Sequence, residues 1–106
     1  MSLTLDEMAA WTAERVGGTF ERWPVEVRCL DLVEEVGELA RAVLVDRGHK
    51  LGPGEDLTVA VCGVLMDVLI VAHDSGVRLD AAYPDLVDQL VRQALSQPPA
   101  PVEAAR

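Results

Sequence analysis

The segment Leu57–Asp74 most constrains the fold, because it is apolar nearly all round and is interrupted at its middle by the acid Asp67. A helix that is apolar on every side belongs in the interior of a helical domain. An unpaired carboxylate there is costly, so Asp67 must be protonated, hydrogen-bonded, paired or metal-bound. No basic residue stands near it in the sequence. We therefore predict a helix over 55–74 that is the most buried element of the chain.

A second segment, Leu30–Val45, places acids beside an apolar stripe. At ~100° per residue, its acids project between about 40° and 140° from Leu30, and its apolar residues between about 180° and 320°. These acids are Asp31, Glu34, Glu35 and Glu38. Only Arg41 offers a counter-charge within the segment, although like charges on one helix face repel. The pattern indicates either a solvated acidic face or a carboxylate face that binds a cation.

Helix start and stop signals divide the rest of the chain. Thr4 and Glu7 form a capping box that starts a helix over 5–16, which Gly17 should end. Pro24 suits the first turn of the next helix. The predicted helices are 5–16, 24–46, 55–74 and a last one from 81 or 85 to 95, and no segment has the alternation of a strand.

The composition favours an aliphatic helical bundle. Hydrophobic residues make up 50% of the chain and aromatic residues only 4%. We expect one all-α domain over 1–95, a four-helix bundle with apolar surface left over for a dimer, and a flexible Pro- and Ala-rich tail over 96–106. The net charge of -9 argues against nucleic acid and anionic membranes as partners, since both attract basic surfaces.

The cysteines and the absence of targeting signals indicate the cytoplasm. Cys29 and Cys62 lie within apolar helical patterns, which suggests buried free thiols in a reducing compartment, although a disulfide between helices is the alternative. No basic segment followed by an apolar run marks a signal peptide. The longest apolar run, Leu57–Ala72, is too short and too polar for a clear membrane span.

The acids on two helices suggest a metal site. Glu35 and Glu38 lie one turn apart, and Asp67 from a facing helix can add a further oxygen. Hard oxygen ligands suit Mg²⁺ or Mn²⁺, whose coordination is often completed by substrate phosphates. The glycine-rich segment 47–54 contains Lys50, so it either complements a helix dipole or closes on phosphate as a mobile basic loop.

The motif LVEEVGELA at Leu32–Ala40 resembles the signature of the MazG-like all-α nucleoside triphosphate pyrophosphohydrolases. That family has E-x-x-E on one helix and E-x-x-D on the next, and Asp67–Ile70 resembles the end of the second motif. The resemblance covers roughly residues 5–80. It implies a Mg²⁺-dependent house-cleaning or nucleotide-pool enzyme that cleaves a nucleoside triphosphate into the monophosphate and pyrophosphate. It also implies a homodimer or a dimer of dimers.

Site roles follow from the resemblance. Glu35, Glu38 and Asp67 would be metal ligands, and Glu34 would support the site or assist the attacking water. Substrate phosphates would meet basic residues outside the motifs. For that role we select Lys50 and Arg92.

The second motif departs from the family pattern. Val64 stands where Glu is expected, and an alignment anchored on Gly76 instead places the motif acids at Ala60 and Gly63. A ligand is missing in either alignment. This departure suggests an alternative, a catalytically impaired MazG-like dimer that binds nucleotide or protein. A third hypothesis is an unrelated helical adaptor whose acids form only a solvated face.

Overall fold

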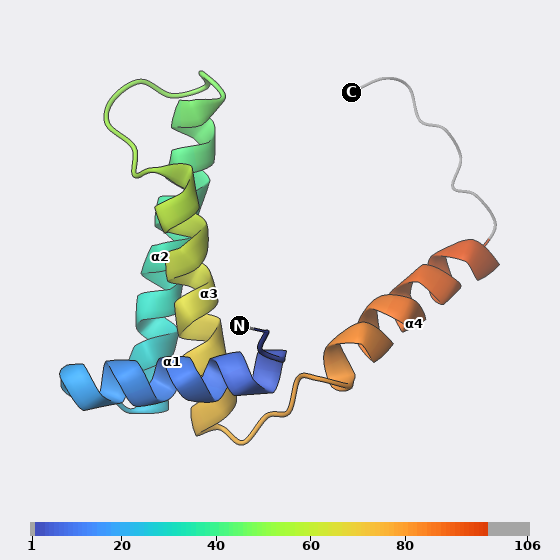
Figure 1. Cartoon of the computed structure of the whole chain (residues 1–106). Helices are drawn as coiled ribbons and strands as arrows, with labels where there is room; N and C mark the ends of the chain where they lie inside the picture. The colour runs from blue at the N-terminus through green and yellow to red at the C-terminus, as the bar shows by residue number, and fades with distance from the viewer. Residues whose placement is uncertain (1, 98–106) are drawn as a thin grey trace.

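The computed structural model describes residues 2–97, which form four helices and no strand. They are α1 (Leu5–Thr19), α2 (Val25–Asp46), α3 (Leu57–Asp74) and α4 (Ala82–Ser96) (Figure 1). The all-α prediction is confirmed. Residues 98–106, which hold most of the predicted tail, lie outside the described part of the chain.

The helices α2 and α3 form a long antiparallel hairpin, and α1 packs across α3 at the end opposite the hairpin loop (Figure 1). Helix α3 contributes the most buried residues, as expected for the helix at the centre of the domain. They are Ala60, Asp67, Leu69, Ile70 and Ala72. By length and composition alone α3 could also cross a membrane, a property that it shares with core helices of soluble proteins. Its other face remains exposed, because only α1 and α2 cover it.

Helix α1 begins at the predicted capping box. The Thr4 hydroxyl accepts a hydrogen bond from the Glu7 amide at 3.1 Å, and the Glu7 carboxylate accepts one from the Thr4 amide at 2.9 Å. The expected end at Gly17 is wrong, because the helix continues to Thr19. Neither Gly17 nor Gly18 takes the positive φ that ends many helices, so the backbone hydrogen bonds run through them.

Helix α4 stands apart from the other three. No helix of the described chain packs against it, and none of its residues is buried. In Figure 1 it projects away from the hairpin at the end of the segment that follows α3. Within one chain, therefore, three helices pack together and the fourth does not.

Both cysteines are free thiols, but their predicted burial is wrong. Cys29 on α2 and Cys62 on α3 are exposed. The apolar patterns around them correctly indicated helices. Their sides of the hairpin are left uncovered because only α1 packs across it.

Candidate metal centre

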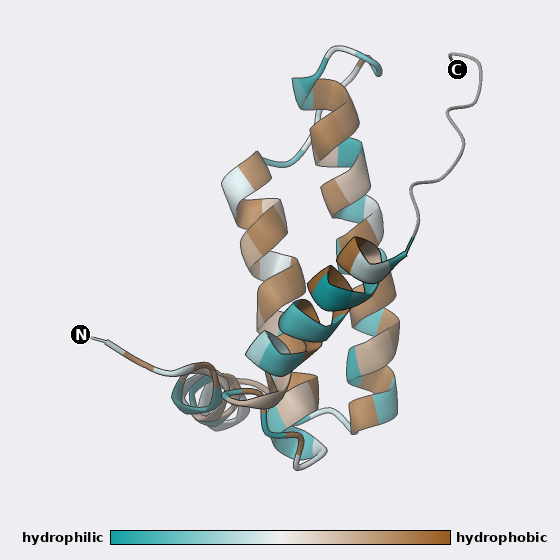
Figure 2. Ribbon diagram, turned by 90° about the vertical axis from the view of Figure 1, so that its right-hand side faces the viewer, coloured by the Kyte–Doolittle hydropathy of each residue, from teal (hydrophilic) through white to brown (hydrophobic). Residues whose placement is uncertain are grey.

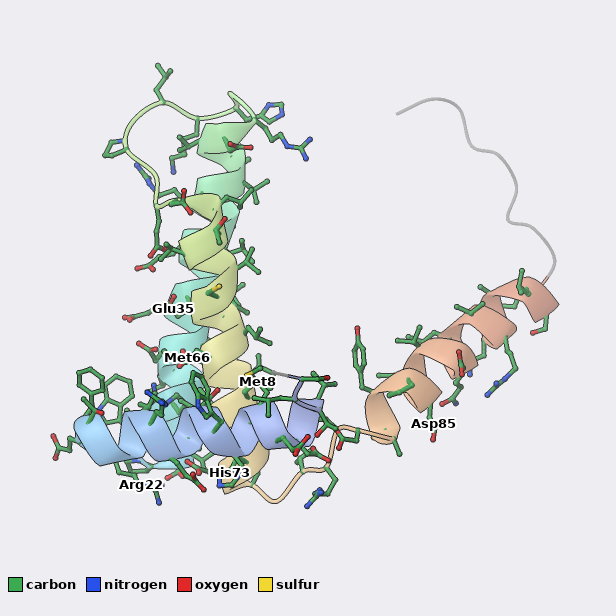
Figure 3. All side chains as sticks on the ribbon, in the orientation of Figure 1. Met8, Arg22, Glu35, Met66, His73 and Asp85 are labelled. Carbon is green, nitrogen blue, oxygen red and sulfur yellow. The ribbon has the colours of Figure 1, made fainter. Side chains whose placement is uncertain are left out.

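Glu35 of α2 lies against helix α3. Its half-buried side chain extends over Gly63 of α3, and a Cβ atom at position 63 would collide with the Glu35 carboxylate. Figure 3 shows Glu35 on the hairpin, far from α4. Glycine at position 63 therefore makes the room in which this carboxylate lies.

Glu38 and Glu55 complete a group of three carboxylates with Glu35. One carboxylate oxygen from each residue lies within 4.8 Å of the others. Within residues 2–97, this is the one group of three or more potential metal-ligating side chains that lie this close together. The E-x-x-E spacing brings Glu38 to the same side of α2 as Glu35. Glu55 comes from the loop that leads into α3, one residue before Asp56. The Asp56 carboxylate accepts a hydrogen bond from the Val59 amide at 3.2 Å and caps the helix.

Sequence reasoning missed Glu55 as a ligand, because an acid at the start of a helix is explained by the helix dipole alone. The available signal was the hairpin itself. Antiparallel helices of this length bring the first residues of α3 alongside α2. A further acid at that point, opposite a motif that already lacked counter-charges, was a candidate ligand.

The electrostatics of this group reflect crowded negative charge. Burial raises the pKa of Glu35, and the nearby charges of Glu38, Asp31, Glu55 and Glu34 raise it further. The predicted counter-charge, Arg41, is engaged elsewhere, since its Nε donates to the Pro53 carbonyl at 3.0 Å. A divalent cation would relieve this repulsion, although exposed acidic groups are also common without one.

Asp67 has a basic partner that the local sequence did not reveal. Arg28 of α2 donates from Nη1 to the Asp67 Oδ1 at 3.1 Å, and both side chains are buried. The Arg28 guanidinium also lies over the Trp23 ring, 4.5 Å from its centre. Of the four states predicted for Asp67, the structure shows the paired one. Its role as a metal ligand stays a prediction, and it is not among the three clustered glutamates.

The ion pair leaves one carboxylate oxygen without a donor. Asp67 Oδ2 and Arg28 Nε are both buried without a hydrogen-bond partner. Burial raises the pKa of Asp67 to about 6, helped by the neighbouring Asp31 carboxyl and opposed by Arg28. Protonation of Asp67 removes the negative charge that burial disfavours and makes one of its oxygens a hydrogen-bond donor, so that oxygen no longer needs a donor itself.

The other predicted residues are exposed. Glu34 borders a small hollow of about 210 Å³ together with Trp23 and Asp31. Lys50 lies in the loop after α2, and Arg92 lies on α4. No hydrogen bond or ion pair joins either cation to another described residue. Arg92 remains distant from the glutamates in the single chain, because α4 packs against no other helix.

The contact between Gly63 and Glu35 also bears on the second motif. The α3 residue opposite the E-x-x-E pair is Gly63, with Ala60 buried one turn before it. These are the positions at which the alignment anchored on Gly76 placed the missing acids. Gly76 itself has a φ of 69° and follows the end of α3. Helix α3 therefore presents no acid to Glu35 at this level, and Glu55 approaches instead from the loop before the helix.

A cavity of about 410 Å³ adjoins the Arg28–Asp67 pair. Phe20, Trp23 and Met66 give it apolar walls, while Arg28 and Asp31 add polar groups. Its size and its mixture of aromatic and polar side chains are typical of small-molecule sites.

Comparison with known proteins adds no relative. No family model, curated protein or solved structure matches the chain. The MazG-like resemblance therefore stays a hypothesis that depends on the motif, and the function has to be argued from the site.

Proposed function

We propose that this chain is a Mg²⁺-dependent nucleoside triphosphate pyrophosphohydrolase that acts in the cytoplasm as a homodimer or a dimer of dimers. The observation that supports this most is the convergence of Glu35, Glu38 and Glu55 without a basic partner among them. Three carboxylates, two from α2 and one from the loop before α3, form a ligand set that suits Mg²⁺ or Mn²⁺ and leaves positions for phosphate oxygens and water.

The residues of the chain have distinct tasks in this proposal. Glu35, Glu38 and Glu55 hold the cation, and Gly63 keeps Glu35 close to α3. When bound, Mg²⁺ neutralises phosphate charge and lowers the pKa of an attacking water. Glu34, next to Glu35 on α2, would accept the proton of that water. Attack at the α-phosphate would release pyrophosphate and leave the monophosphate.

The cavity beside Trp23 supports a nucleotide as substrate. Its aromatic and sulfur-containing walls suit a flat ring, and Asp31 and Arg28 offer hydrogen-bonding groups to ring edges. Lys50 remains our candidate for phosphate contact from the hairpin loop. Arg92 can join the site only if α4 lies against a hairpin.

Pyrophosphate release tests the proposal. A panel of nucleoside triphosphates with Mg²⁺ or Mn²⁺ should yield pyrophosphate, and Glu38→Gln should lower turnover by at least about 100-fold. Glu26→Gln, which removes an acid from the exposed first turn of the same helix, is the matched control and should keep full turnover. Failure of the wild-type chain to cleave any nucleotide of the panel would contradict the proposal.

A second candidate is a MazG-like module that binds nucleotide or protein without catalysis. It is favoured by the absence of an acid at Gly63 and Val64 and by the pairing of Asp67 with Arg28. Calorimetry separates the two functions. Nucleotide binding that does not need a divalent cation and is not followed by pyrophosphate release supports the module.

A further inference from the structure

The detached helix α4 carries a continuous apolar stripe. Its apolar residues recur at helical spacing, so they share one face, while Asp85, Asp88 and Arg92 lie on the other. Leu86 is 52% exposed and Leu90 is 56% exposed, which is unusual for leucines in an amphipathic helix. The stripe consists of Tyr83, Leu86, Val87, Leu90 and Ala94.

The α2–α3 hairpin has an uncovered apolar face of its own. On each helix the exposed apolar residues follow one stripe, and the antiparallel packing turns both stripes to the same side of the hairpin. Figure 2 views the hairpin with α4 in front of it, and both hairpin helices are coloured largely as hydrophobic. The residues are Val33, Val36 and Leu44 on α2, and Leu57, Val61, Leu65 and Val68 on α3.

The segment between α3 and α4 is fixed to the start of α1. Asp6 accepts hydrogen bonds from the Leu79 amide at 2.7 Å and from Arg78 Nε at 3.1 Å. In return, the Asp80 carboxylate accepts a hydrogen bond from the Asp6 amide at 2.9 Å. This anchored turn lies directly before Ala82, where α4 begins, and α4 projects from it away from its own hairpin (Figure 1).

Much apolar surface of the described chain has nothing to cover it. Only 28% of α3 is buried although the helix is apolar nearly all round. Exposed valines and leucines on α2 and α4 add to this surface. Apolar surface of this extent is typical of an interface between chains.

We propose that α4 is an exchanged arm that packs its apolar stripe on the α2–α3 face of a second copy of this chain. Two such arms, related by a two-fold axis, would complete two four-helix bundles, each with α1, α2 and α3 from one chain and α4 from the other. The proposal rests on the dimer of the proposed function but not on its catalysis. It also gives Arg92 a route to the hairpin of the partner.

Analytical ultracentrifugation of charge variants tests the arm. The full chain should sediment as a dimer or a larger assembly, and Leu86→Glu with Leu90→Glu should raise the dimer dissociation constant at least tenfold. Gln89→Glu with Ser96→Glu adds the same charge to the polar side of α4 and should leave that constant unchanged. A monomeric wild-type chain, or equal dissociation constants for both variants, would overturn the proposal. Circular dichroism checks that helix content is retained.

Crosslinking distinguishes exchange from closure on the same chain. In a background of Cys29→Ser and Cys62→Ser, a chain with Leu65→Cys is mixed with a chain with Leu90→Cys and treated with a bis-maleimide. A crosslink between the two chains is expected. A second sample contains one chain that carries both Leu65→Cys and Leu90→Cys. Crosslinks that form only within this chain and not between the mixed chains, or no crosslink in either sample, would overturn exchange. These readouts need no turnover, so absent pyrophosphate release would refute the enzyme and leave the arm standing.

Discussion

The α2–α3 hairpin holds acidic groups of two kinds, one turn or more apart along the same pair of helices. Asp67 is buried beside Arg28, and its negative charge has a partner inside the protein. Glu35, Glu38 and Glu55 converge at the hairpin surface, and no ion pair joins them to a basic residue within 2–97. Burial raises the pKa of Glu35 in the cluster and of Asp67 in the ion pair. Only Asp67 has a cationic side chain of the protein, Arg28, beside it.

The difference separates a structural acid from a candidate ligand. A buried carboxylate that has an arginine partner is tied into the packing, and removing the partner should damage the fold. A partly exposed cluster that lacks a counter-charge is open to a cation from solvent. Asp67, the acid inside an apolar helix that stood out most in the sequence, is therefore a structural acid.

Arg28→Ala should give the largest loss of stability. It leaves Asp67 buried without its cation, which typically costs about 3–5 kcal/mol of unfolding free energy. Urea denaturation measures the loss. Arg15→Ala is the matched control, because Arg15 lies over the Trp11 ring at 4.9 Å but has no buried carboxylate, and it should cost less than about 1 kcal/mol.

The partner substitution sharpens this test. If Asp67 is structural, Arg28→Met combined with Asp67→Leu should recover most of the stability lost in Arg28→Ala, since a matched apolar pair can replace a buried ion pair. Equal losses for Arg28→Ala and Arg15→Ala would contradict the structural role of the pair.

The pH dependence of stability should report on Asp67. Its pKa is raised to about 6 in the folded chain from 3.8, so the folded state holds a proton that the unfolded state has released. The resulting stabilisation is complete below pH 4, is lost as the pH rises through 6, and amounts to at most about 3 kcal/mol. Thermal unfolding should show this decline in the wild type and a weaker one in Asp67→Asn. Identical slopes would contradict it.

Gly63→Ala should have a small effect on stability and a clear effect on cation binding. Alanine favours the helix by up to about 1 kcal/mol, but its Cβ displaces the Glu35 carboxylate. The thermal stabilisation by Mn²⁺ should therefore fall, while Gly37→Ala, at an open position on α2, should keep it. If both variants respond to Mn²⁺ alike, Glu35 does not hold a cation in this position.

The sequence predicted the helices well because caps and periodicity are local. The capping box at Thr4 and the extent of α3 needed no knowledge of tertiary structure. The detachment of α4 was beyond such reasoning, since its pattern specifies an apolar face but not what covers that face. The exposure of Cys29 and Cys62 has the same origin.

The site was predictable in part. Glu35 and Glu38 were found because they share a helix turn, whereas Glu55 joins them only through the fold of the hairpin. The Arg28 partner of Asp67 lies 39 positions earlier, and no local pattern indicates that pairing. The roles of Glu34, Lys50 and Arg92 stay predictions.

The hydrogen bonds of Asp6 also bear on the order in which the chain folds during synthesis. The α2–α3 hairpin joins neighbouring segments and can form early. The bond from the Leu79 amide to Asp6 spans 73 positions, so the start of α1 cannot find this partner until about three-quarters of the given sequence has been translated. We expect the start of α1 to become fixed only after the α2–α3 hairpin has formed.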